Sequence, residues 1–330
     1  MALQQRMEWI DSARGLSMMA ILLFHTEVYF TGGEIIPYNL YVCNSLLTFF
    51  FISGFLFRNP QKAFSLRRKL QAVAKGIFLP YLIFTTAIAV PKSLMHDDLP
   101  VQDAFLAIAT GHASWFVAAL IVAEIILALL CHFAKGRKMV IFAACALPYL
   151  AIAAAYHFVD NSFLESINLW CWQNALMVLI FMFAGLHLRE TGMLQSLSSK
   201  KAICIMTAAL LSVKAVEVRY GLWMTLQPIN VSSFALLLTD GLLGAVLILS
   251  VCQKLPKMRL VEYTGRHSLY YYFICGGVPL TVSTLLHHFG IAYHGNYLIV
   301  LAAFTLVYIT ATAIVYLMGV VVKNSGVKGS

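Results

Sequence analysis

Three ionisable residues near the start of the chain have the types and the spacing of a proton-transfer site. Asp11, Arg14 and His25 fall in an apolar stretch that predicts a helix over residues 11–30. The eleven steps from Arg14 to His25 make about three helical turns, so both side chains lie on one face about 16 Å apart along the axis. Asp11 lies about 40° from the His25 direction on the same geometry. The three residues therefore form a polar stripe, and Glu27 points elsewhere.

Such a stripe suits group transfer within a membrane. An imidazole titrates near neutral pH and can take a proton from a hydroxyl nucleophile. A guanidinium can hold a phosphate or a thioester carbonyl in two places. The alternative is structural: Asp11 pairs with Arg14 at the helix end while His25 bonds a neighbouring helix. The spacing alone leaves both interpretations open.

A second group follows at the end of a helix predicted over residues 38–57. Ser53 and Gly54 offer a small surface that a helix or an acyl chain can approach closely. Ser53 is either a nucleophile or a serine that bonds its own backbone. Beyond it the chain enters its most basic connection, predicted as a loop whose charge marks the cytoplasmic side: Arg58, Arg67, Arg68, Lys69 and Lys75.

Later helices hold further polar candidates. Glu124 and Asp240 each either orient His25 by accepting its second ring N–H or bond a neighbouring helix. Asn174 either binds acceptor hydroxyl groups or packs helices. Trp115, at the outer end of its helix, has the place of an interfacial aromatic-belt residue.

The remaining histidines and the cysteines do not suggest a metal. His287, His288 and His294 lack the flanking ligands of a specific metal site, so we expect solvated loop histidines and no metal. The seven cysteines contain no C-x-x-C pair, so we expect them to be small hydrophobic residues buried in a helix bundle.

Composition identifies the solvent that the helices must face. Hydrophobic residues make up 61% of the chain and charged residues 11%, against about 25% charged in soluble domains. The sequence therefore predicts an all-α polytopic membrane protein, a single domain over residues 1–330 with a short tail at 323–330. Ten spans are expected, at 11–30, 38–57, 74–91, 113–132, 138–158, 168–188, 201–218, 231–252, 267–288 and 296–322.

The basic residues support this count. Most Lys and Arg side chains fall in alternate connections, which places both termini in the cytoplasm. The net charge of +9 thus reflects basic residues on the cytoplasmic side of a membrane and does not indicate binding to nucleic acid.

Several of these motifs together resemble acyltransferase family 3. They are the run from Met7 to Leu16, His25 eleven residues after Arg14, and the run Phe-Phe-Phe-Ile-Ser-Gly-Phe-Leu-Phe-Arg from Phe49 to Arg58. Further agreement lies in Pro80-Tyr81, Ser114 to Val117 and Gly265 to Leu269. Within the family, the chain is most similar to the stand-alone branch typified by fucose 4-O-acetylases. One departure is Cys275, which stands where members often have a histidine.

The resemblance implies a ten-helix enzyme in a bacterial inner membrane that transfers acetyl from acetyl-CoA to a hydroxyl of a surface or lipid-linked glycan. Arg14 and His25 then take the family's essential pair, with Asp11 beside them, and no oligomeric state is implied. The alternative function is a secondary transporter or a flippase for a glycan intermediate. The donor would bind near Arg14, Ser53, Arg58, Arg67, Arg68, Lys69 and Lys75. The acceptor would bind near Trp115, Glu124, Asn174 and Asp240.

Overall fold

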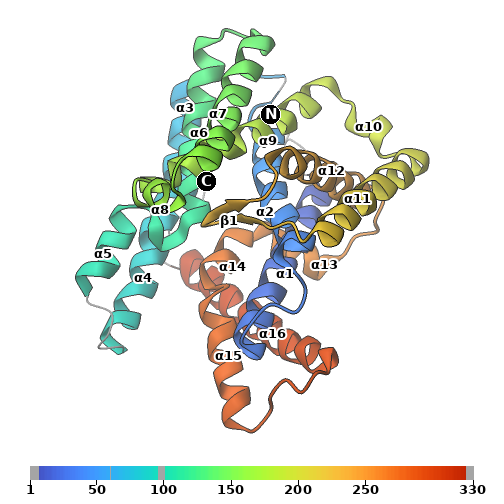
Figure 1. Ribbon diagram of the computed structural model, residues 1–330. Helices are drawn as coiled ribbons and strands as arrows, with labels where there is room; N and C mark the ends of the chain where they lie inside the picture. The colour runs from blue at the N-terminus through green and yellow to red at the C-terminus, as the bar shows by residue number, and fades with distance from the viewer. Residues whose placement is uncertain (1–6, 60, 96–100, 325–330) are drawn as a thin grey trace. The chain divides into compact units, whose positions relative to one another are not determined.

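The structure is a computed structural model that describes residues 7–59, 61–95 and 101–324 (Figure 1). All ten predicted segments are helical. They are α1 (Glu8–Thr31), α2 (Tyr38–Phe55), α3 (Leu66–Val73) continued by η1 (Ala74–Phe78) and α4 (Leu79–Met95), α6 (Trp115–Phe133), α7 (Lys138–Phe158), α9 (Trp172–Thr191), α11 (Lys200–Tyr220), α12 (Phe234–Cys252), α14 (Ser268–Ile274) with α15 (Gly277–His288), and α16 (Tyr297–Asn324).

The connections contain elements that the sequence did not predict. They are α5 (Val101–Ala109), η2 (His112–Ser114), α8 (Asn161–Ser166), η3 (Leu169–Cys171), α10 (Leu194–Leu197), α13 (Arg259–Arg266), and an antiparallel hairpin of β1 (Met224–Leu226) and β2 (Ile229–Val231). Two predicted loops are also corrected. The basic run from Arg67 to Lys69 is the first turn of α3, because Ser65 caps that helix by accepting the Arg68 amide. His287 and His288 end α15 instead of lying in a loop.

Six helices in the described part of the chain are long and apolar enough to cross a membrane, and the pair α14 and α15, bent by 49°, makes a seventh if it is one span. The chain is thus a largely helical membrane protein. The helices α1, α2 and α11 do not qualify on composition because α1 and α11 carry several charges and α2 carries amides and hydroxyls. Ten spans and cytoplasmic termini stay predictions.

The described residues divide into two compact units. Unit 1 comprises Met1–Thr48, Ser198–Leu210 and Gly244–Ser330. In it, α1 packs along α13, α15 and α16. The contact with α13 has no room for a side chain on either helix. A Cβ added at Gly15 would lie 2.0 Å from the Val261 carbonyl oxygen, and one at Gly265 would lie 1.7 Å from the Asp11 oxygen. The two backbones therefore touch through glycines.

The end of α1 in unit 1 is tied to its loop and to α16. Gly32 ends the helix in the left-handed region with φ of 81°. The buried Glu27 carboxylate accepts the backbone amides of Ile35 and Ile36, and it accepts the Tyr297 hydroxyl at 2.8 Å. One side chain thus joins three segments of unit 1.

Unit 2 comprises Phe49–Leu197 and Leu211–Leu243. Its centre is α9, which packs on α6 and α7. The end of α2 also meets α9 without intervening side chains. A Cβ at Gly54 would lie 1.9 Å from the Met182 oxygen, and one at Gly185 would lie 2.0 Å from the Phe51 oxygen. The small surface predicted at Ser53-Gly54 is therefore a helix contact.

Candidate functional site

The helix α1 carries Arg14 and His25 on one unbroken α-helix, so the predicted shared face holds. Both side chains are half-buried. The His25 ring stacks with Tyr29 at a centroid distance of 6.2 Å and meets the edge of Phe24 at 5.7 Å. Among the described residues of unit 1, no side chain bonds a ring nitrogen of His25. The described contacts of the imidazole are therefore aromatic.

The first turn of α1 is held by charges from α13. Arg266 Nε lies 3.2 Å from Asp11 Oδ2, and its guanidinium also lies 3.4 Å from Glu262. Lys257 pairs with Glu8, which raises the pKa of the Lys257 ammonium. Asp11 therefore helps to anchor the helix that carries Arg14 and His25.

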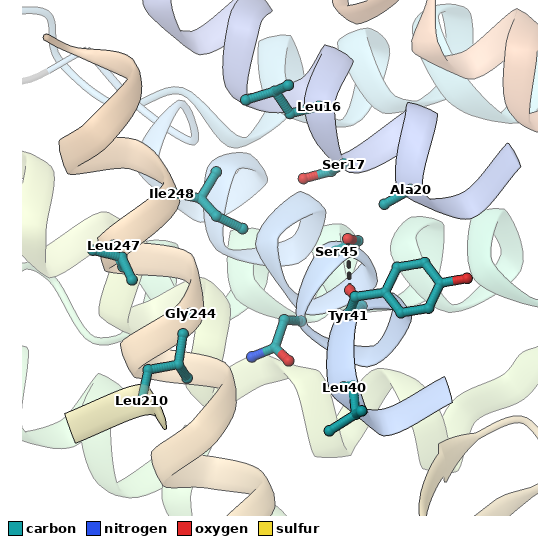
Figure 2. Close-up of a pocket in the computed structure, with 11 residues that line it drawn as sticks. Leu16, Ser17, Ala20, Leu40, Tyr41, Ser45, Leu210, Gly244, Leu247 and Ile248 are labelled. Carbon is teal, nitrogen blue, oxygen red and sulfur yellow. Dashed lines mark hydrogen bonds between the residues drawn. The ribbon is translucent and has the colours of Figure 1, made fainter. Parts of the chain in front are cut away.

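A cavity of about 280 Å³ opens beside α1 in unit 1 (Figure 2). Ser17 and Ala20 of α1 line it, and in Figure 2 both lie on the side of α1 toward Ile248. Ser17 is one turn deeper than Arg14 and about 60° around the helix from it. Its hydroxyl is buried and bonds no described group. Leu16 of α1 and four other aliphatic residues complete the apolar lining, and α2 adds three polar side chains: Leu40, Leu210, Leu247 and Ile248, and Tyr41, Asn44 and Ser45.

A cluster in unit 2 joins residues that the sequence assigned to different substrates. The Ser53 hydroxyl of α2 donates to Glu124 Oε1 of α6. Lys69 of α3 places its Nζ 2.6 Å from Glu124 Oε2 and 4.1 Å from the centre of the Phe57 ring. Glu124 was expected to orient His25 or bind the acceptor, but here it holds Ser53 and Lys69.

The remaining basic candidates of unit 2 separate into paired and exposed groups. Arg58 pairs with Glu190, which also binds Lys138 at 3.0 Å. Arg67 and Arg68 on α3 and Lys75 on η1 are exposed. Only those three of the predicted donor-binding cations in unit 2 thus stand open to an anionic ligand.

The other predicted acceptor-binding residues have varied surroundings in unit 2. Asn174 is buried, bonds the Leu226 carbonyl of the hairpin, and accepts from Asn168 at 2.8 Å. Asp240 is buried and lies 2.7 Å from Lys214 Nζ. Trp115 is half-buried and meets only the edge of Phe116 among the ring contacts of the described residues.

Comparison with known proteins decides the family. A family model described as an acyltransferase domain matches residues 7–320, which is nearly the whole chain. The chain belongs to acyltransferase family 3. No curated protein and no solved structure matches it. Family membership supports a membrane acyltransferase and favours it over the transporter or flippase alternative.

Within this acyltransferase, the structure adds groups that the sequence did not single out as partners. Arg266 binds Asp11, and Lys214 lies 3.2 Å from the buried Glu217 as well as near Asp240. The only sequence signal for either pairing was an ionisable residue in or beside an apolar segment. His287, expected to be solvated, bonds the Phe30 carbonyl at 3.0 Å.

Proposed function

We propose that this protein is an O-acyltransferase that moves acetyl from cytoplasmic acetyl-CoA to a hydroxyl of a surface or lipid-linked glycan in a bacterial inner membrane. The observation that carries the proposal is α1, one unbroken helix that presents Arg14 and a half-buried His25 on one face of a family 3 chain. A guanidinium for the donor and an imidazole for the acceptor are the two groups that such a transfer needs.

In the proposed mechanism, a His25 ring nitrogen takes the proton of the acceptor hydroxyl, and the acceptor oxygen attacks the carbonyl carbon of the acyl group that the donor supplies. Arg14 binds the donor or stabilises the oxyanion that develops. The exposed Arg67, Arg68 and Lys75 bind the phosphates of coenzyme A. The half-buried Trp115 provides an aromatic face for the sugar. No metal takes part.

The experiment compares two histidine variants in cells. His25→Ala should lower acetylation of the surface glycans by about 10²- to 10⁴-fold, the usual contribution of a general base. His157→Ala is the matched control, because His157 is exposed in the last turn of α7. Mass spectrometry of the glycans, with membrane-inserted protein quantified in parallel, measures both. Near-normal acetylation in the folded His25→Ala protein would remove the general-base role.

A second variant tests the partner residue. Arg14→Lys keeps the charge but loses the planar fork, so we expect severe loss of transfer with normal insertion. Full activity would show that Arg14 serves only membrane topology.

A further inference from the structure

Ser53 makes a hydrogen bond that the other hydroxyl residues of its helix do not make. Ser45 donates to the Tyr41 carbonyl and Thr48 to the Asn44 carbonyl, each four residues back along α2. This is the usual bond of a hydroxyl in an apolar helix. Ser53 instead donates to the Glu124 carboxylate, 71 residues away on α6. A carboxylate that accepts a serine proton is the arrangement of an activated nucleophile.

The surroundings of Glu124 hold its carboxylate in place for this bond. Its side chain is only 4% exposed, and Lys69 balances its charge at 2.6 Å. The carboxylate therefore has one oxygen on Ser53 and the other on Lys69. Phe57 covers the ammonium at 4.1 Å and helps to hold it there. Lys69 is therefore a positioning residue for Glu124.

The end of α2 that carries Ser53 is fixed on its neighbour by close backbone contacts. The backbone contacts of Gly54 with Met182 and of Gly185 with Phe51 fix this end of α2 on α9. Ser53 lies between these two contacts and is half-buried.

We propose that Ser53 carries the acyl group between donor and acceptor, with Glu124 as its base. The proposal rests on the acyl-transfer function proposed above. In the first half-reaction, Ser53 Oγ forms a bond to the thioester carbon, its proton passes to Glu124, and the carbon–sulfur bond breaks. Glu124 then returns the proton to the thiolate, which leaves as free coenzyme A. In the second half-reaction, the acceptor oxygen replaces Ser53 on the acyl carbon, and the hydroxyl proton of the acceptor ends on the Ser53 oxygen.

The test incubates the purified full-length chain in nanodiscs with radiolabelled acetyl-CoA and no acceptor. One acetyl group should attach to the peptide that contains Ser53, as an ester that strong base cleaves. Ser53→Ala should lose the label, and Glu124→Gln should slow labelling by about 10²-fold or more. Ser45→Ala is the matched control from the same helix and should label normally.

Ser53→Cys keeps the proposal testable if the alanine variant fails to fold. A cysteine carrier would hold the acetyl group as a thioester, so its label should become cleavable by neutral hydroxylamine. A label that persists in Ser53→Ala, or a wild-type protein that acetylates glycans in cells without ever labelling, would overturn the carrier. If the wild type neither becomes labelled nor acetylates glycans, the proposed acetyl-transfer function fails as well. The two assays therefore distinguish failure of the Ser53 carrier from failure of the proposed function.

Discussion

The glycine contact between α1 and α13 predicts a variant that damages activity without touching a reactive group. Gly15→Ala adds one methyl group beside Arg14. That Cβ would lie 2.0 Å from the Val261 carbonyl oxygen, whereas real Cβ atoms do not approach closer than 3.0 Å. Because the obstacle is backbone, the helices must separate by about 1 Å, a displacement that can cost about 10²-fold in rate when it moves a catalytic group.

The cost in stability should leave the protein folded. Overpacking of this kind usually costs about 1–3 kcal/mol, which a folded membrane protein can survive. Gly265→Ala tests the same contact from the other helix, because its Cβ would meet the Asp11 oxygen at 1.7 Å. Gly33→Ala is the control, since no atom lies within 4 Å of its added Cβ.

The assay measures acetyl transfer and thermal unfolding on the same detergent-purified samples. Gly15→Ala and Gly265→Ala should both lose about 10²-fold in transfer while still unfolding cooperatively, and Gly33→Ala should match the wild type. Transfer within a few-fold of wild type in Gly15→Ala would refute the reasoning. It would mean that the position of α1 on α13 does not set the position of Arg14.

Three further predictions concern unit 2 and the topology. The double variant Arg67→Gln, Arg68→Gln should raise the KM for acetyl-CoA and leave kcat nearly unchanged, because both side chains are exposed on α3. Steady-state kinetics measure KM and kcat separately. An unchanged KM contradicts binding of the coenzyme A phosphates by these residues. Lys214→Met should destabilise the protein by about 3–5 kcal/mol because it removes the ammonium that pairs with the buried Glu217 and Asp240. An unchanged unfolding midpoint contradicts this. In a cysteine-free background, Ser162→Cys should react with an impermeant maleimide on intact cells, whereas Arg137→Cys should react only after the membrane is opened; the reverse pattern contradicts cytoplasmic termini.

Periodicity and composition predicted the helices well because each depends on residues close together in the sequence. The apolar run after Glu8 and the spacing of Arg14 and His25 were enough to place both side chains on one face of α1. The basic run at Arg67 was assigned to a loop because charge suggested a membrane boundary. The segment is a helix instead, because Ser65 caps its start and the apolar η1 and α4 continue it.

Pairings between distant residues were beyond sequence reasoning. Glu124 is a predicted partner for His25, because a buried carboxylate can accept a hydrogen bond from a buried imidazole. The structure pairs Glu124 with Ser53 and Lys69, which lie 71 and 55 positions earlier in the chain. Periodicity states which face of a helix a residue occupies, but not which other helix that face meets. The bond from Asn174 to Leu226 in the hairpin was missed for the same reason.

The Glu27 carboxylate has a consequence for biosynthesis. Two of its donors, the amides of Ile35 and Ile36, emerge from the ribosome only eight and nine residues after it, whereas the Tyr297 hydroxyl follows 270 residues later. The turn after α1 can therefore satisfy this carboxylate soon after it is synthesised, and the Tyr297 hydroxyl of α16 can join only much later.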